Sequence, residues 1–135
     1  MRKIDLIIVH CSAVRPNQTS SVAQINAWHK KLGWKCIGYH YVIRRDGTVE
    51  KGRDEASIGA HCSGYNKFSI GVCYEGGLAM DGSPKDTRSD AQKASLLKLL
   101  KELKQRYPSA KIRGHCDFAN KACPCFDATT EYKDL

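Results

Sequence analysis

Hydrophobic residues in this chain fall into short runs and into longer stretches where they recur every three or four positions. Residues 4–10 (I-D-L-I-I-V-H) form an apolar run that is typical of a buried strand. Residues 39–45 (Y-H-Y-V-I-R-R) and 48–51 are rich in β-forming residues and flank Asp46-Gly47, the dipeptide of two-residue hairpins. Two further strands are predicted, one at the short apolar run 70–74 and one at residues 111–115, which end in a histidine.

Two stretches between these strands have the spacing of amphipathic helices. In the first, residues 20–34, the apolar positions are Val22, Ile25, Trp28 and Leu32. In the second, which follows a Ser89–Gln92 capping box and ends before Pro108, they are Leu96, Leu100, Leu103 and Tyr107. We expect Trp28, Trp34 and the Leu96 series to lie in the core.

The resulting order, β-α-β-β-β-α-β, predicts a single α/β domain over residues 1–135, with a central mixed β-sheet flanked by α-helices. A chain of 135 residues can bury a core of its own without disulfide staples. No apolar run approaches the roughly 18 residues of a membrane span, and the N-terminus lacks the apolar region of a signal peptide. We therefore expect no membrane insertion, cytoplasmic synthesis and a monomer.

The charge balance favours an acidic partner. Lys and Arg number 22 against 14 Asp and Glu, a formal charge of +8, which suits nucleic acid, anionic lipid or an acidic cell-wall polymer. The basic residues are scattered, and no nucleic-acid-binding motif or zinc-finger spacing is present. We therefore expect no nucleic-acid partner. Seven cysteines without a signal peptide indicate thiols that are free or hold a metal.

Two predicted strands end in histidines, His10 and His115, and the cysteine-rich sequence K-A-C-P-C follows the second. A catalytic zinc site needs three protein ligands from imidazole, thiolate or carboxylate and leaves a fourth position for water. From spacing alone, either Cys123 or Cys125 supplies the third ligand. Cys11 and Cys116 each come directly after a histidine, and strand alternation predicts both as core thiols on the opposite face.

Seven motifs in order give a more specific signal than this spacing. They are Val9-His10-Cys11-Ser12-Ala13; Gly38-Tyr39-His40-Tyr41; residues 44–50 (R-R-D-G-T-V-E); Gly52-Arg53-Asp54-Glu55; residues 61–66 (H-C-S-G-Y-N) with 69–72 (S-I-G-V); Gly114-His115; and Lys121-Ala122-Cys123-Pro124 with Phe126-Asp127. The chain resembles the zinc-dependent N-acetylmuramoyl-L-alanine amidases of the phage-lysozyme type and, more distantly, the peptidoglycan recognition proteins. The resemblance covers Ile4 to about Asp127.

The resemblance implies one bound zinc ion and hydrolysis of the amide between N-acetylmuramic acid and L-alanine in bacterial peptidoglycan. It places the zinc ligands on His10, His115 and Cys123, and so favours Cys123 over Cys125. It places the catalytic tyrosine and lysine on Tyr39 and Lys121. A lysine can stabilise a developing oxyanion, and a tyrosine can orient water or carry a proton.

Two residues of the polar loop at 52–69, His61 and Asn66, are candidates for substrate binding. His40 alternates with Tyr39 along the predicted strand, so we expect it to face away from the site. A non-catalytic module that binds peptidoglycan is the alternative function. Cys123 argues against that module, because non-catalytic relatives typically lack the thiolate ligand. The family also implies a phage or prophage lysis enzyme that reaches the wall through a membrane opened by a holin.

Overall fold

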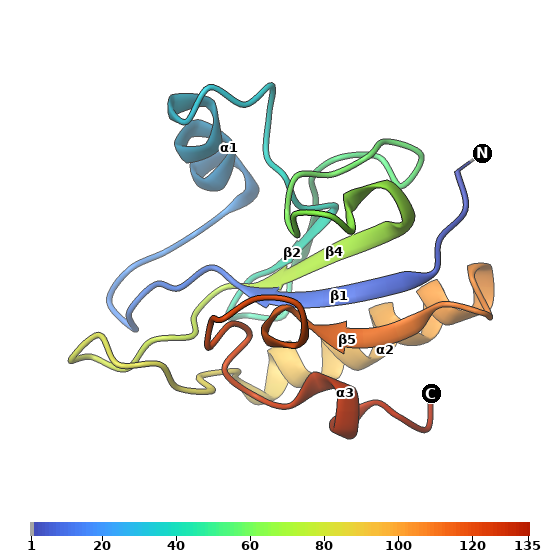
Figure 1. Cartoon of the computed structure of the whole chain (residues 1–135). Helices are drawn as coiled ribbons and strands as arrows, with labels where there is room; N and C mark the ends of the chain where they lie inside the picture. Colours follow the sequence, from blue (N-terminus) through green and yellow to red (C-terminus); the bar gives the residue numbers. More distant parts are fainter. Residues whose placement is uncertain (1) are drawn as a thin grey trace.

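The computed structural model describes residues 2–135, and within them five strands form one mixed sheet in the order β3-β2-β4-β1-β5 (Figure 1). The strands are β1 (Leu6–Cys11), β2 (Tyr41–Ile43), β3 (Val49–Lys51), β4 (Ser69–Tyr74) and β5 (Lys111–Gly114). Strand β1 lies between β4 and β5 and pairs with both in parallel, and β2 is parallel to β4. Only the β2–β3 pair is antiparallel among these strands.

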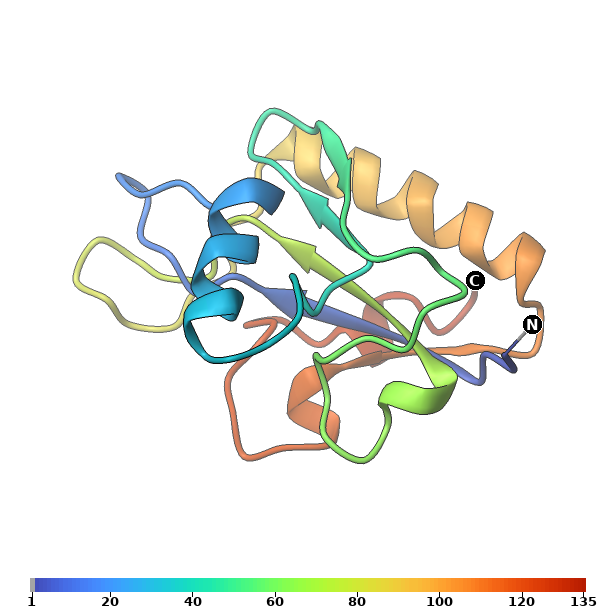
Figure 2. The ribbon, with the colours of Figure 1, turned by 90° about the horizontal axis from the view of Figure 1, so that it is seen from above.

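Helices cover both faces of this sheet, as Figures 1 and 2 show. They are α1 (Val22–Lys31), α2 (Asp90–Arg106) and the short α3 (Ala128–Glu131), with 3-10 turns at Asn66–Phe68 and His115–Asp117. The predicted mixed α/β sandwich is therefore confirmed; α3 and the two turns were not predicted. Within residues 2–135, no helix has the length and apolar character needed to cross a membrane.

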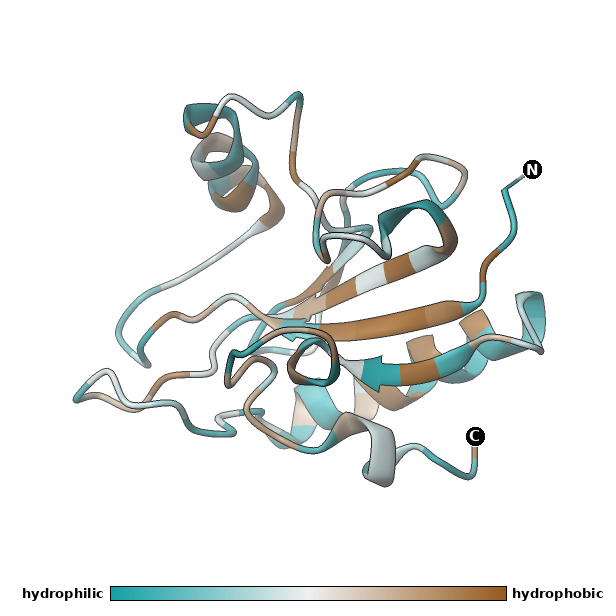
Figure 3. Ribbon diagram, in the orientation of Figure 1, coloured by the Kyte–Doolittle hydropathy of each residue, from teal (hydrophilic) through white to brown (hydrophobic). Residues whose placement is uncertain are grey.

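Helix α2 packs on one face of the sheet and contributes most of the core there. Leu96, Leu100 and Leu103 are fully buried against Ile7, Val9, Ile70 and Val72, which are the alternate residues of β1 and β4. Figure 3 shows the apolar central strands above this helix. Gln92, also fully buried, donates to the carbonyls of Ile43 and Glu75 and ties the start of α2 to the strand ends. The core prediction for the Leu96 series is confirmed for these leucines.

Helix α1 lies over the opposite face of the sheet but buries little of itself. Ile25 is its one buried residue and packs with Ile37, Val42 and Cys73. Trp28 is 41% exposed and Trp34 is 39% exposed, so the prediction that both tryptophans belong to the core is wrong. The helical spacing was correct, but the contact with the sheet is narrow.

The Asp46-Gly47 turn joins β2 to β3 as expected, but with a longer loop than the predicted two residues. The Arg44 N–H donates to the Thr48 carbonyl at 2.8 Å, and the Gly47 N–H donates to the Arg44 carbonyl at 2.9 Å. Residues 45–47 therefore form the loop. Gly47 has a φ of 91°, the left-handed conformation that glycine provides in three-residue hairpins.

Candidate active site

Two parallel strands bring the two strand-end histidines to one edge of the sheet. Val9 of β1 pairs with Gly114 of β5, so His10 and His115 come next at the same edge. Their ring centroids are 4.6 Å apart. His10 is 1% exposed, while His115, in the 3-10 turn after β5, is half-buried and borders solvent.

The loop after β5 returns Cys123 to this pair. The Cys116 N–H donates to the Cys123 carbonyl at 2.8 Å, and the Cys11 N–H donates to Cys123 Sγ at 3.2 Å. Further along, the buried Tyr74 hydroxyl donates to the Pro124 carbonyl at 2.6 Å. Backbone contacts from β1 and a side chain from β4 therefore fix where the thiol of Cys123 lies.

His10, His115 and Cys123 form a cluster whose ligand atoms all lie within 4.8 Å of one another. His10 Nδ1 is 3.9 Å from Cys123 Sγ. Two ligands of a tetrahedral zinc ion are roughly 3.3–3.6 Å apart, given Zn–N and Zn–S bonds of about 2.0–2.3 Å. Two imidazoles and one thiolate are also a suitable donor set for a catalytic zinc site, so the residues present fit the metal.

The electrostatics of the cluster favour neutral imidazoles, which are the form that binds metal. Burial, followed by the charges of His61, His115 and Lys121, holds the pKa of His10 well below its usual range. Burial and the Lys121 ammonium lower the pKa of His115 in the same direction. Both histidines therefore present unprotonated nitrogen lone pairs at neutral pH.

The other cysteines near the cluster point elsewhere. Cys125 Sγ donates to the Gly77 carbonyl at 3.2 Å and contacts Cys11 Sγ at 3.9 Å, away from the histidine pair. Cys11 is buried in the core on the α2 face, as predicted. Cys116 is exposed, so the prediction that it is a core thiol is wrong. The reason is that β5 ends at Gly114, and the 3-10 turn that follows breaks the strand alternation.

Tyr39 lies next to the cluster, with its ring centroid 5.0 Å from that of His10. Burial, followed by the nearby thiols of Cys73, Cys123 and Cys11, raises the pKa of Tyr39 well above its usual value. Its hydroxyl therefore keeps its proton and can donate a hydrogen bond to a group in the site. Lys121 is exposed and comes two residues before Cys123 on the same loop.

A groove of about 490 Å³ opens beside the cluster. It is lined by Trp34, Ala60, His61, Cys62, Ser63, Asn66, His115, Phe118, Ala119 and Lys121. One metal-ligand candidate and the lysine thus face the same space as the predicted substrate-binding residues. Trp34 was not among the predicted site residues, and nothing in its helical spacing separated it from a core residue.

The structure gives His61 and Asn66 partners of their own within the protein. Asn66 Oδ1 accepts hydrogen bonds from the backbone N–H groups of His61 and Cys62, both at 2.9 Å. These bonds stabilise the turn formed by residues 61–66 at the edge of the groove. The ring of His61 is turned toward His10 and Ser69. Substrate binding by these two residues stays a prediction.

His40 does not face away from the site, and that prediction is wrong. Strand β2 begins at Tyr41, so the alternation assumed between Tyr39 and His40 does not apply. His40 is fully buried on the same side of the sheet as His61, with ring centroids 5.8 Å apart. It accepts from the Gly71 N–H through Nδ1 and lies within hydrogen-bond distance of the Ser57 carbonyl through Nε2.

Known proteins similar to this chain include endolysins, peptidoglycan-recognition proteins and a solved amidase. The endolysin of Escherichia phage T7 is 50% identical over 123 residues, which cover 91% of this chain and 82% of that protein. A peptidoglycan-recognition protein of Drosophila melanogaster is 30% identical over 138 residues, covering 98% of this chain and 75% of that protein. The solved N-acetylmuramoyl-L-alanine amidase LysC from Clostridium intestinale superposes with a TM-score of 0.81 at 28% identity, over 96% of this chain and 82% of that one.

More distant structures share the fold alone. Drosophila PGRP-LB superposes over 100% of this chain and 82% of that one with a TM-score of 0.81, at 23% identity.

The model of the N-acetylmuramoyl-L-alanine amidase family matches residues 1–126, nearly the whole sequence. With that match and with endolysins about half identical to it, the chain belongs to the N-acetylmuramoyl-L-alanine amidase family.

Proposed function

We propose that His10, His115 and Cys123 hold one zinc ion per chain, and that hydrolysis of the amide between N-acetylmuramic acid and L-alanine takes place there. Amidase activity on peptidoglycan follows from the family; the proposal concerns the groups that carry it out. The observation that supports it most is the convergence of these three ligand atoms within 4.8 Å, beside the groove that His115 lines.

The protein supplies the zinc site with a rigid frame and an open side. When bound, zinc polarises a carbonyl and lowers the pKa of a bound water toward about 7. His10 is held from behind in the sheet, whereas His115 borders the groove, so a substrate reaches the cluster from the His115 side. The groove would then hold the scissile amide beside the ligand cluster.

Lys121 and Tyr39 act on charge and protons at the reacting amide. Lys121 lines the groove beside His115, so its ammonium is available to stabilise negative charge that develops on the carbonyl oxygen. Tyr39 keeps its proton because burial raises its pKa, and its hydroxyl can donate to the oxyanion or pass a proton toward the leaving amine. We assign both as catalytic residues.

The remainder of the groove accommodates the sugar and the stem peptide. Asn66 uses its Oδ1 for two backbone N–H groups, which leaves its amide nitrogen as the donor we propose for a substrate carbonyl. The site is assembled from one chain, which supports a monomer as the active form.

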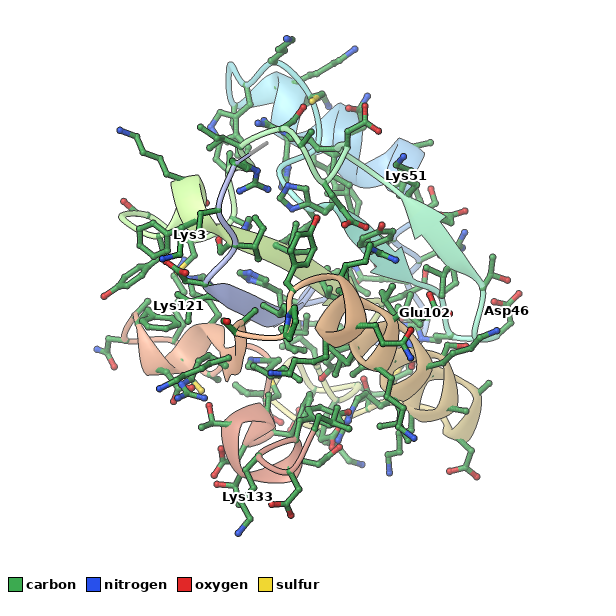
Figure 4. All side chains as sticks on the ribbon, turned by 90° about the vertical axis from the view of Figure 1, so that its right-hand side faces the viewer. Lys3, Asp46, Lys51, Glu102, Lys121 and Lys133 are labelled. Atoms are coloured by element: carbon green, nitrogen blue, oxygen red, sulfur yellow. The ribbon has the colours of Figure 1, made fainter. Side chains whose placement is uncertain are left out.

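The net charge of +8 suits a substrate that carries stem-peptide carboxylates. In Figure 4, Lys3, Lys51, Lys121 and Lys133 lie around the outside of the molecule rather than in one patch. A distributed positive field of this kind concentrates the enzyme on the wall. We propose that it acts there as a phage or prophage lysis enzyme, after a holin-type protein has opened the membrane.

Metal analysis of the protein purified without added metal tests the proposal. We expect about one zinc per chain, and we expect Cys123→Ser to lose both the zinc and the clearing of purified walls. Cys125→Ser is the matched control, because its thiol faces Gly77, and should keep both. Wild-type protein that binds walls but carries no zinc and does not cut them would instead indicate a recognition module.

A further inference from the structure

His61 touches a metal-ligand candidate without belonging to the ligand cluster. Its Nδ1 lies 2.9 Å from His10 Nε2, and its Nε2 lies 3.1 Å from Ser69 Oγ. His61 is 8% exposed and Ser69 is fully buried, so these contacts are made away from bulk water. Both ring nitrogens of His61 therefore have partners inside the protein.

The proton positions along these three side chains follow from the orientation of His10. Its Nδ1 faces Cys123 Sγ at 3.9 Å and must be unprotonated to bind a metal. A neutral imidazole then carries its proton on Nε2, so His10 donates to His61 Nδ1. His61 must accept there, which places its own proton on Nε2 and makes Ser69 Oγ the acceptor of that proton.

The ring of His61 is held in place by packing as well as by hydrogen bonds. A Cβ at Gly71 would come within 2.6 Å of His61 Cγ, and a Cβ at Gly59 within 2.8 Å of His61 Cδ2. The ring thus packs closely against the backbone at Gly59 and Gly71, where any side chain would clash with it. Its Nδ1 is fixed as the partner of His10.

We propose that His61 is a positioning residue of the metal centre, which fixes the tautomer and ring orientation of His10 through the chain His10–His61–Ser69. The inference rests on the proposed function, because it requires His10 to be a metal ligand. A metal-bound histidine generally donates its second N–H to a carboxylate, a carbonyl or water. Here a neutral imidazole, backed by a hydroxyl, occupies that position.

Zinc affinity tests the inference without relying on activity. Competition with a chromophoric chelator gives the zinc dissociation constant of each folded variant. His61→Leu keeps the bulk but removes the acceptor, and we expect zinc to bind 10- to 100-fold more weakly, the usual loss for such partners. His61→Asn places an oxygen near the position of Nδ1, and we expect it to restore affinity to within about threefold of wild type.

A nuclear magnetic resonance measurement adds a direct signature. In the zinc-loaded, ¹⁵N-labelled wild type, the Nε2-bound proton of His10 should exchange slowly with water and should be lost from the spectrum in His61→Leu. Ser69→Ala leaves both histidines intact and removes only the last acceptor. We expect it to weaken zinc binding by about threefold or more, which provides a second variant if His61→Leu does not fold.

His40→Leu is the matched control, since His40 is another fully buried histidine whose hydrogen-bond partners are Gly71, Ser57 and Arg2 rather than a ligand. It should lower the melting temperature and leave the zinc dissociation constant unchanged. A folded His61→Leu that binds zinc as tightly as wild type, or a His40→Leu that loses as much affinity, would overturn the inference. If the wild-type protein itself binds no zinc, the proposed function fails. That outcome differs from those that overturn only the role of His61, in which the wild type binds zinc.

Discussion

Individual side chains around the cluster divide into those that fix the ligands and those that face the substrate. We propose that Tyr39 and Lys121 belong to the second group; neither is among the three ligand candidates. We expect Lys121→Ala and Tyr39→Phe to keep about one zinc per chain and to lower kcat about 100-fold or more, since each removes a group that acts on developing charge or on a proton. Zinc content and initial rates on purified walls measure the two effects separately. Unchanged turnover in either variant would remove that residue from the mechanism.

We expect His40 to make the stability of the protein depend on pH. Burial lowers the pKa of His40 to about 4, and the charges of Arg2 and Arg53 act in the same direction. The hydrogen bond to the Ser57 carbonyl opposes this shift. Protonation would also place a proton on Nδ1, which would then face the Gly71 N–H that it accepts from in the neutral form. In the unfolded chain this histidine takes up its proton below about pH 6.5, whereas in the folded chain it does so only near pH 4. The contribution of neutral His40 to the free energy of unfolding is therefore fully present above pH 6.5 and is lost as the pH falls toward 4.

Urea unfolding of metal-free protein between pH 7.5 and pH 4.5 measures this effect. His40→Asn keeps an acceptor for the Gly71 N–H but does not titrate in this range. We expect it to reduce the pH slope of the free energy of unfolding by up to about 1.4 kcal/mol per pH unit below pH 6.5. Equal slopes in wild type and His40→Asn would show that His40 has the same pKa in the folded and the unfolded chain.

The two long helices begin with the same capping box but depend on it differently. Ser21 accepts from the Gln24 N–H at 3.1 Å, and Ser89 accepts from the Gln92 N–H at 3.1 Å. Ser89 also donates to the Arg45 carbonyl and starts a helix that carries the main core. Helix α1 buries only Ile25.

We therefore expect Ser89→Ala to lower the global free energy of unfolding by about 1–2 kcal/mol, within the usual range for a lost helix cap. Ser21→Ala should change the global value by less than about 0.5 kcal/mol and increase amide exchange only within α1. Urea midpoints and hydrogen exchange distinguish the two variants. Similar global losses would mean that α1 is coupled to the core more tightly than its burial indicates.

The elements could be predicted where local pattern and tertiary burial agree, and not elsewhere. The Leu96 series and the capping box located α2 because a wide apolar stripe packs on the sheet. The apolar positions of α1 have the same spacing, yet Trp28 and Trp34 are exposed, because spacing does not reveal how much sheet a helix covers. The turn after β5, which exposes Cys116, likewise depends on where the strand stops.

The ligand set shows the same limit at the level of the site. Strand ends indicated His10 and His115, because parallel strands share an edge. Spacing could not separate Cys123 from Cys125; only the resemblance did. The difference arises from backbone contacts at Cys11 and Cys116 that no local pattern encodes. The partnership of His61 with His10 joins positions 51 residues apart and was equally hidden.

The whole molecule carries a charge of +8, and this should make wall hydrolysis sensitive to salt. The Debye length falls from about 10 Å at 0.1 M to about 3 Å at 1 M, so added salt weakens attraction between the basic surface and an acidic wall. We expect KM for intact walls to rise at least about threefold between 0.05 and 0.5 M NaCl, with kcat on a small soluble muropeptide nearly unchanged. A KM for walls that does not respond to salt would show that the charge has no part in substrate capture.

Digestion of purified peptidoglycan with and without a zinc chelator tests the central claim, that a zinc ion held by His10, His115 and Cys123 supports amide hydrolysis. The account predicts newly freed L-alanine amino termini without new reducing sugar ends, loss of this product in chelator, and recovery when zinc is restored to wild type but not to Cys123→Ser. Undiminished release of L-alanine amino termini from protein shown by elemental analysis to be free of metal would contradict it.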